Sequence, residues 1–586
     1  MKDRKKSASP RVLRVEHVDD IPVLLALMKQ VGLVELLDRH FPTHHLWKGV
    51  LSFGEVAATW ITHVVSEGDH RLNHVEPWAQ QNRDTLQACL GKTVRALDFH
   101  DDRLADVLDA LADEEGWQSF EADLNGNTIR VYNLKPQGFR LDTTTASSYA
   151  KVLDENGILQ FGHSKDNDNL PQLKIAAAVL DPLGLPITTV VVPGQNADDP
   201  LYVPEMKKVN AIFGAGGKTF FGDCKMASLD TRAYLASTKD WYVCPLSESQ
   251  LSREQRKALL APVFSGIQKL KPVCRPTESA EQEPELIARG FSCDVSLSRE
   301  VDGRVVRWKE RRWVVQSVAF ARSQEEKLDK RLEKATAELE QLQERKQGKK
   351  RLTSEEMKAA ADRIIEKNRV VGMLACRLRT IRHEKIVRGY GKRPQQTVRE
   401  EEEHRLEASR QVEAIAQAKR EMGWQVYATN NLTLNLVGVV LGYRGQYRIE
   451  DCWSRLKGRS LSLTPMYLAT DSRIQGLVML LSLGVRALTL LEWVVRRKLE
   501  EKGETIKGVY AGQGGRKTKR PSAEILLRAF GGVSLTVVEV AGQVTRHVTP
   551  LTTLQQRLLE LWDFPKNLFQ RIALHSPKPP PRLSER

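Results

Sequence analysis

Three acidic residues stand where a metal-dependent reaction on phosphate could use them. Asp142 lies in "FRLDTTTAS", where apolar Phe139 and Leu141 alternate with polar residues, so its carboxylate falls on the polar face of a strand. Asp223 follows the apolar run "KTFFG" at the end of another strand-like segment. Glu450 lies in "YRGQYRIEDCWSRLKGRS", which holds five positive charges. Because hard Mg²⁺ takes carboxylate oxygens and shares them with substrate phosphates, these residues predict a divalent-metal site.

The segment around Glu450 is predicted to be a helix with a functional face. Tyr443, Glu450 and Lys457 are spaced by seven and seven, and a heptad step on a helix drifts by only about 20°. They are therefore expected to share one face, with Gln446 beside them. A neighbouring basic stripe comprises Arg444, Arg448, Arg455 and Arg459. The carboxylate is then flanked along its own face by an aromatic hydroxyl and an ammonium group.

Each of these carboxylates also has a simpler structural alternative. Asp142 can be a turn or cap residue, Asp223 a helix N-cap, and Glu450 an ion-pair partner of a nearby arginine. Packing or capping is the ordinary role of isolated histidines and tryptophans, and here it applies to His70, His74 and Trp78.

The spacing of apolar residues changes along the chain, from helical to strand-like, before the first two aspartates. From Val15 to about Leu124 the pattern is helical, as in "IPVLLALMKQVGLVELL". From Thr128 it turns strand-like, in "TIRVYNL", "FRLDTTTAS", "QLKIAAAVLD", "PITTVVVPG", "KTFFGD" and "WYVCPLS". Consecutive short strands favour an antiparallel meander, with helical residues 227–237 before the last strand.

The following stretch, residues 251–422, has a different pattern. It contains a strand-like pair, "GRVVRWKERRWVVQSVAF", and then a coiled-coil seam of about two heptads from Leu328 to Leu342. Thr353 and Glu356 form a predicted capping box for a second helix, which indicates an antiparallel helical hairpin. The charged run "REEEEHRLEASRQVEAIAQAKREMG" is predicted to be another solvated helix.

Strand character returns in "WQVYATN", before a long helical block from about Val437 to Leu499. Its most apolar part, Leu477–Val495, is interrupted by Arg486 and Glu492, so a buried core helix is expected rather than a membrane span. The remaining residues alternate as strands, add one helix and end in a Pro-rich basic tail.

Composition places these elements in a soluble protein of two to four domains. The chain has 586 residues and a net charge of +15, from 89 Lys and Arg against 74 Asp and Glu, which favours a polyanionic partner. Seven scattered cysteines without a CxxC pair indicate neither a zinc site nor a disulfide framework. The absence of an apolar leader fits a reducing cytoplasm.

The sequence resembles the bacterial insertion-sequence transposases with a DDE catalytic triad, in a branch that has a helical N-terminal domain. That family carries a Tyr-x2-Arg-x3-Glu-x6-Lys signature on the helix that bears its glutamate. In this chain the signature falls on Tyr443, Gln446, Glu450 and Lys457. Gln446 departs from the signature arginine and keeps hydrogen-bonding capacity without the charge. The two family aspartates match "LDTTT" at Asp142 and "FFGDCKMAS" at Asp223.

The resemblance implies an α/β fold in which a small all-α domain precedes an RNase H-like mixed sheet flanked by helices. A large insertion of β-strands and a helical hairpin or coiled coil would interrupt the sheet. The implied regions are a basic tail (1–14), a helical N-terminal domain that binds DNA ends (15–125), a first part of the catalytic core (126–250), the insertion (251–422), a second core part with the Glu helix (423–500) and a C-terminal region with a basic tail (501–586).

The implied activity is metal-dependent DNA strand cleavage and strand transfer, that is, cut-and-paste transposition. Two Mg²⁺ or Mn²⁺ ions would be held by Asp142, Asp223 and Glu450. The residues expected to contact DNA phosphate are Tyr443, Gln446, Arg448 and Lys457. Implied partners are terminal inverted repeats, target DNA and a second copy of the chain, in the bacterial cytoplasm near the nucleoid and away from membranes. The alternatives are an inactive DNA-binding relative, another RNase H-like nuclease, or a coiled-coil scaffold.

Overall fold

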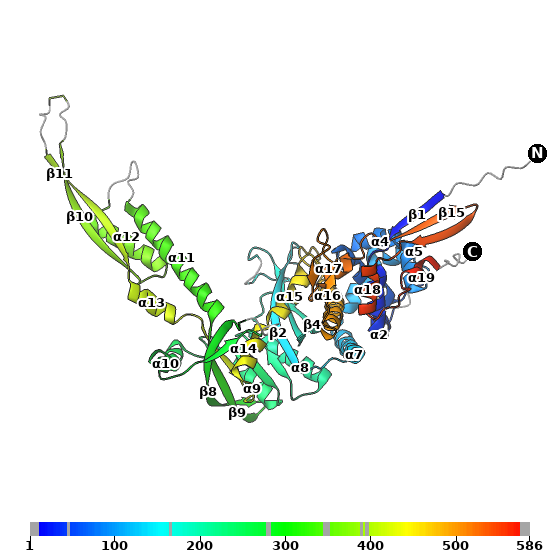
Figure 1. Ribbon diagram of the computed structural model, residues 1–586, viewed down its shortest axis with the longest axis horizontal. Helices are drawn as coiled ribbons and strands as arrows, with labels where there is room; N and C mark the ends of the chain where they lie inside the picture. Colours follow the sequence, from blue (N-terminus) through cyan, green and yellow to red (C-terminus); the bar gives the residue numbers. More distant parts are fainter. Residues whose placement is uncertain are drawn as a thin grey trace, which may run out of the picture. The chain divides into compact units, whose positions relative to one another are not determined.

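The computed structural model divides the chain into two compact units (Figure 1). Unit 1 comprises Met1–Cys244, Leu297–Trp308 and Leu441–Arg586, and unit 2 comprises Pro245–Ser296 and Lys309–Val440. The residues that the structure describes are 11–43, 47, 49–162, 167–276, 283–343, 352–386, 391–392 and 398–574. The first ten residues of the predicted basic tail and the Pro-rich C-terminal end lie outside them.

Unit 1 begins with a helical region, as the sequence predicted. Its helices are α1 (Ile21–Gln30), α2 (Leu33–His40), α3 (Phe53–Glu67), α4 (Leu72–Gln81), α5 (Arg83–Leu90), η1 (Ala96–Phe99), α6 (Asp101–Leu111) and α7 (Glu114–Tyr132). Gly32, with φ of 71°, separates α1 from α2 inside the first apolar run. The strand predicted from Thr128 is wrong, because α7 buries Trp117, Phe120, Leu124 and Thr128 at helical spacing.

The two ends of unit 1 meet in a three-stranded sheet of order β1-β15-β16. Its strands are β1 (Arg11–His17), β15 (Ser534–Val540) and β16 (Gln543–Val548), and both pairs are antiparallel. Arg11–Arg14 therefore belong to a paired strand and not to the predicted tail. The C-terminal region also contains β13 (Ile506–Lys507), β14 (Lys517–Thr518), α17 (Ala523–Arg528), α18 (Thr553–Leu561) and α19 (Gln570–Leu574).

The largest sheet is mixed, and five of its strands are assigned to unit 1. Those of unit 1 are β2 (Gly138–Ser147), β3 (Gln172–Asp181), β4 (Leu185–Pro193), β5 (Thr219–Phe221) and β6 (Trp241–Pro245), in the order β4-β3-β2-β5-β6. The predicted meander is confirmed for β2, β3 and β4, which are antiparallel. It is wrong for β5 and β6, which run parallel to β2, since α8 (Tyr202–Phe213) and α9 (Leu229–Ser237) make the crossovers.

The long helical block forms three helices, of which the first begins in unit 2 and ends in unit 1, and the other two belong to unit 1. The three helices are α14 (Leu436–Arg444), α15 (Tyr447–Lys457) and α16 (Asp471–Glu501). Because the helix is interrupted between Arg444 and Tyr447, Tyr443 does not share a continuous helical face with Glu450, as the heptad spacing had predicted. α16 is, within the described ranges, the one helix long and apolar enough to cross a membrane, but 94% of its most apolar window is buried in the protein. The expected core helix is thus observed.

Unit 2 takes in most of the predicted insertion. Its strands have the order β12-β9-β8-β7 and comprise β7 (Lys271–Cys274), β8 (Leu286–Val301) up to Ser296, β9 (Arg304–Ser317) from Lys309, and β12 (Trp424–Thr429). The remaining ends of β8 and β9 belong to unit 1. Its helices are α10 (Arg253–Phe264), α11 (Val318–Gln343), α12 (Ser354–Lys367) and α13 (Val412–Arg420). β10 (Leu374–Ile386) and β11 (Val398–Arg410) pair as a two-stranded antiparallel ribbon.

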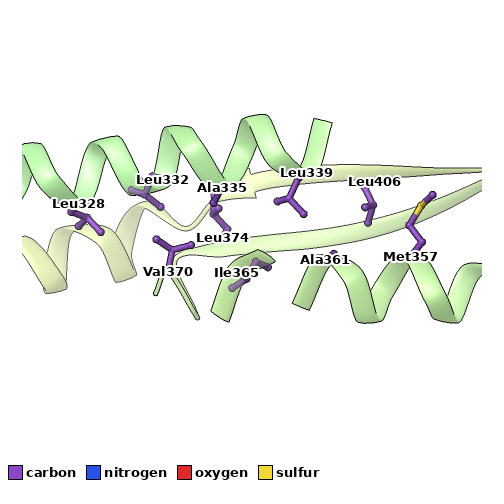
Figure 2. Packing of buried hydrophobic residues seen from close by; sticks show 10 residues of the cluster. All are labelled: Leu328, Leu332, Ala335, Leu339, Met357, Ala361, Ile365, Val370, Leu374 and Leu406. Carbon is purple, nitrogen blue, oxygen red and sulfur yellow. The ribbon is translucent and has the colours of Figure 1, made fainter. Parts of the chain in front are cut away.

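The predicted helical hairpin of unit 2 is confirmed, and the ribbon completes its core. Thr353 and Glu356 form the expected capping box at the start of α12. Figure 2 shows the buried seam of α11 facing α12 and the two strands; the labelled residues are Leu328, Leu332, Ala335, Leu339, Met357, Ala361, Ile365, Val370, Leu374 and Leu406. The helix predicted for "REEEEHRLEASR" is wrong. That run is strand β11, whose acids pair across the ribbon, Glu402 with Arg382 and Glu407 with Arg379.

Candidate active site

Asp142 lies within β2 and is contacted by the helix that carries Glu450. Its neighbours Phe139 and Leu141 are buried, whereas Asp142 itself is half-buried. The indole Nε1–H of Trp453, on α15, donates a hydrogen bond of 3.1 Å to Oδ2 of Asp142. The predicted strand position of Asp142 is therefore confirmed, and the alternative of a turn or cap residue is excluded.

Asp223 follows β5 and is held by two donors. The hydroxyl of Tyr202, at the start of α8, donates to Oδ1 of Asp223 at 2.7 Å, and the backbone N–H of Lys225 donates to the same oxygen at 2.9 Å. Asp223 is not the N-cap of the following helix, because α9 is capped by Ser228, which accepts from the N–H of Thr231. The alternative that Asp223 is a helix N-cap is therefore excluded.

Tyr202, the partner of Asp223, was missed in the sequence. Burial raises the pKa of its hydroxyl well above the ordinary value, and the negative charges of Asp223, Asp142 and Asp198 raise it further. The phenol therefore stays protonated and donates to Asp223. The two aspartates are related by the sheet: β2 and β5 are parallel neighbours with Arg140 opposite Phe221, and Asp142 and Asp223 each follow two residues later at the same end. No sequence signal singled out Tyr202, because its role depends on the packing of α8.

Glu450 occupies a row of residues along α15 whose other members contact β2. The row is spaced by four, three and four positions and comprises Gln446, Glu450, Trp453 and Lys457. The side-chain amide of Gln446 donates to the carbonyl of Leu141 at 3.3 Å, and Nζ of Lys457 donates to the carbonyl of Thr145 at 3.2 Å. Glu450 lies between these contacts and is exposed. Within the described ranges, its carboxylate makes no hydrogen bond or ion pair, so the ion-pair alternative is not observed.

The arginines near Glu450 are used within the fold. Arg448 donates to Oδ1 of Asp181 at 3.2 Å, and the same oxygen accepts from the buried Arg140 at 2.6 Å. The guanidinium of Arg140 also donates to the carbonyl of Gly442 at 2.8 Å and so connects α14 to the sheet. Arg455 binds Glu492 and Glu524. The predicted basic stripe is therefore in part a structural network that fixes α14 and α15.

Comparison with known proteins adds little to this site. Residues 13–122 match a family described only as a domain of unknown function, DUF4277. A cryo-EM structure of the piggyBac transposase synaptic complex with hairpin DNA is similar over 87% of this chain and 79% of that chain, with 9% sequence identity and a TM-score of 0.34. No curated protein matches the chain.

The segment that matches this domain contains His70, His74 and Trp78, and His70 and Trp78 are buried, as expected for packing residues. His63 lies edge-on to Trp78, with ring centroids 5.1 Å apart. His74 Nδ1 lies 2.7 Å from Oδ2 of Asp69, which also accepts from Arg71. These contacts account for the cluster without a metal or a stacked base.

The carboxylates of the candidate site fit a hard divalent cation by their chemistry, since every one offers oxygen ligands. Asp142 and Asp223 follow paired positions of the parallel strands β2 and β5, and Glu450 lies on α15, whose Trp453 contacts Asp142. Among the side chains that the structure describes, no group of three or more His, Cys, Asp or Glu is arranged to hold a metal ion. The metal site therefore stays a prediction from the sequence.

Proposed function

We propose that this protein is a DDE-type transposase that cleaves DNA at the ends of an insertion sequence and joins the ends to target DNA. The main support for this proposal is the row of residues, Gln446, Glu450, Trp453 and Lys457, that runs along α15 beside β2. Gln446, Trp453 and Lys457 contact β2, the strand of Asp142, and the parallel register of β2 with β5 supports a position of Asp223 near Asp142. The three residues follow one another in the order and context of the family signature, with Glu450 more than 200 positions after Asp223.

The strand arrangement of unit 1 supports an RNase H-like core. β2, β3 and β4 are antiparallel neighbours, and β5 and β6 continue the sheet in parallel on the other side of β2. An RNase H-like core has this order, with its first acidic residue on the central strand. Asp142 lies on β2, the middle of these five strands. The coiled-coil scaffold accounts for α11 and α12 and for none of these features.

In the proposed reaction, divalent metal held by Asp142, Asp223 and Glu450 would activate the attacking oxygen and neutralise charge on the scissile phosphate. The chain's own groups would prepare that site. Tyr202 orients the carboxylate of Asp223, and Trp453 orients that of Asp142. The Lys457 ammonium, held near Thr145 beside the same strand, offers positive charge to a phosphate oxygen.

The remaining parts of the proposal follow from the resemblance and the charge of the chain. A net charge of +15 suits binding to DNA. The helical N-terminal region would bind the terminal repeats, and Tyr443, Gln446 and Arg448 would act near the phosphate backbone. A second copy of the chain would join the complex so that two ends are cut together, in the bacterial cytoplasm.

The proposal is tested with a DNA duplex that carries the inverted repeats flanking the coding region. Mg²⁺-dependent nicking at the repeat ends is expected for the wild-type protein. Asp142→Asn should abolish nicking and leave DNA binding intact, because the charge that holds the metal is lost. Asp302→Asn is the matched control, since Asp302 lies in an exposed turn with φ of 48°, which asparagine tolerates. That variant should nick at the wild-type rate.

Two outcomes would replace this function with one of its alternatives. Binding of the repeats without nicking, in the presence of Mg²⁺ or Mn²⁺, would indicate an inactive DNA-binding relative. Cleavage without joining of the 3′ end to a second duplex would indicate another RNase H-like nuclease. Nicking that persists in Asp142→Asn would overturn the assignment of the site.

A further inference from the structure

Two tyrosines form an exposed stacked pair beyond the end of β2. The rings of Tyr149 and Tyr467 lie 5.6 Å apart between centroids, with 23° between their planes. Tyr149 is 59% exposed and Tyr467 is 66% exposed. Large aromatic rings normally lose most of this surface on folding, so a stacked pair that stays open to solvent has the properties of a binding surface.

The backbone holds this pair rigidly, although the rings are open. The N–H of Tyr149 donates to the carbonyl of Met466 at 3.0 Å, and the hydroxyl of Ser148 donates to the same oxygen at 3.2 Å. Ser148 and Met466 also form a parallel β-bridge, and both are fully buried. The hydroxyl of Thr464 donates to the carbonyl of Lys457, which ties the second segment to the end of α15. The platform is therefore an extension of β2 and α15.

The position of the pair relates it to the candidate active site. Asp142, Thr145 and Tyr149 follow one another along β2 and its extension, and Lys457 contacts the middle one. At about 3.3 Å per residue, Tyr149 lies at most roughly 23 Å beyond Asp142. A DNA strand rises about 3.4 Å per stacked nucleotide, so at most about seven nucleotides cover this distance. A strand that passes the carboxylates and Lys457 thus reaches the tyrosines.

A hollow lies along the segments that follow the two tyrosines in the chain, and Lys151 and Ala469, each two residues beyond one of them, line it. Its volume is about 210 Å³, and its lining includes Leu153, Ala469 and the exposed Lys151. The lining also contains Asp154 and Asp471, whose carboxylates each accept a backbone N–H, at 2.8 Å and 2.9 Å. Apolar walls with a nearby ammonium suit a nucleobase and its phosphate, whereas the carboxylates disfavour a phosphate within the hollow itself.

We propose that Tyr149 and Tyr467 form a stacking platform for an unpaired base of the DNA strand, within about seven nucleotides of the cleaved position. This inference rests on the proposed function and adds a substrate feature to it, namely that the strand is read there as a single strand. Every base has an aromatic face, so the platform takes bases without sequence preference. Duplex DNA buries those faces within its own stack and cannot use the platform.

The test compares two single-stranded oligonucleotides of equal length and charge, one complete and one with abasic positions at its centre. Binding to the full-length protein is measured by fluorescence anisotropy in EDTA, so that no cleavage occurs. The wild-type protein is expected to bind the abasic strand about tenfold more weakly, since removal of one base–aromatic stack typically costs about that factor. In the double variant Tyr149→Ala and Tyr467→Ala this difference should disappear.

Two further variants separate stacking from other effects. The double variant Tyr149→Phe and Tyr467→Phe keeps both rings and should keep the tenfold difference. Phe320→Ala removes another exposed aromatic side chain, 37% exposed on α11, and should also keep the tenfold difference. An abasic penalty that is absent in the wild-type protein, or unchanged in the double alanine variant, would overturn the platform.

A second measurement keeps the proposal testable if the alanine variant fails to fold. Single strands containing 5-iododeoxyuridine are photocross-linked to the wild-type protein, and the adduct is located by mass spectrometry. An adduct on Tyr149 or Tyr467 is expected, and adducts only elsewhere would contradict the proposal. Asp142→Asn should keep the adduct, because stacking needs no metal. Loss of nicking and loss of stacking are therefore separate outcomes, and either proposal can fail alone.

Discussion

At the scale of single residues, the candidate site depends on hydrogen bonds that hold two carboxylates in fixed orientations. Tyr202 donates to Asp223 and Trp453 donates to Asp142, while Glu450 has no partner among the residues described. A buried phenol whose pKa is raised by burial and by neighbouring carboxylates cannot act as a base at neutral pH. Tyr202 is thus a positioning residue, and its removal tests whether Asp223 needs to be oriented.

Tyr202→Phe is expected to lower the Mg²⁺-dependent nicking rate about tenfold while leaving DNA affinity unchanged. The variant keeps the ring and loses one hydrogen bond to a charged group, which is worth about 1.5–3 kcal/mol. Rates are measured at saturating DNA, with Mg²⁺ varied. Tyr234→Phe, at a half-buried tyrosine on α9, is the control and should nick normally. A wild-type rate in Tyr202→Phe would show that the hydrogen bond is unimportant.

His63 is expected to make the N-terminal helices sensitive to acid. Burial lowers the pKa of its imidazole from 6.5 to about 4, so the unfolded chain binds more protons than the folded one between these values. The stability it contributes is complete above pH 6.5 and is lost as the pH falls toward 4, by about 3 kcal/mol in total.

This loss is measured as the free energy of unfolding in urea between pH 7.5 and 4. His63→Phe, which keeps a ring beside Trp78, should flatten the dependence on pH. The exposed His547→Gln is the control and should leave it as steep as in the wild-type protein. A slope that is equally steep in His63→Phe would assign the acid sensitivity to another group.

At the scale of elements, close approach between helices sets the shape of unit 1. α16 passes α6 at Gly476, where an added Cβ would lie 2.0 Å from the carbonyl oxygen of Leu108. A backbone carbonyl in a helix cannot move aside to relieve such a clash, whereas the end of a flexible side chain can. The contact explains why α16, otherwise rich in Leu and Val, has glycine at this position.

Gly476→Ala is therefore expected to destabilise unit 1 by about 1–3 kcal/mol or more, since it overpacks a buried helix contact. The higher helix propensity of alanine offsets about 1 kcal/mol of this at most. Gly126→Ala on α7 makes the same change with nothing within 4 Å of the new Cβ, and it should be neutral or stabilising. Thermal unfolding of both variants measures the difference. Equal stabilities would refute a backbone clash at Gly476.

At the scale of the whole molecule, a net charge of +15 is distributed over two units, and some of its arginines are engaged in internal ion pairs. Charge on this scale favours DNA through the release of counterions, which makes affinity fall steeply with salt. Lys457 donates a hydrogen bond to the carbonyl of Thr145, which places its ammonium group beside the strand that carries Asp142. It is the cation on α15 best placed to meet a phosphate.

Lys457→Gln is expected to weaken binding to all DNA sequences alike and to reduce the slope of log affinity against log salt by about one, as for one lost phosphate contact. The slope is measured by anisotropy between low and physiological salt. Lys257→Gln, at an exposed position on α10 of unit 2, is the control for loss of one charge. If both variants change the slope equally, Lys457 is part of the general charge and not a specific contact.

The local sequence pattern was enough to predict those elements whose structure depends on residues close to one another in the chain. The alternation around Asp142 predicted β2, Thr353 and Glu356 predicted the start of α12, and the leucines from Leu328 predicted the buried seam of α11. The apolar block of residues 477–495 was correctly assigned to a buried helix. Each of these features repeats with a period of two or of three to four residues, which a single segment displays by itself.

Only the tertiary structure decided the features that depend on distant partners. β11 is a strand because its acids meet the arginines of β10, although its composition is that of a solvated helix. Tyr202 reaches Asp223 because α8 packs on the sheet, and the helix breaks before α15, so that Tyr443 leaves the face of Glu450. Spacing along the chain limits which residues can share a face, but packing between segments hundreds of residues apart determines which of them meet.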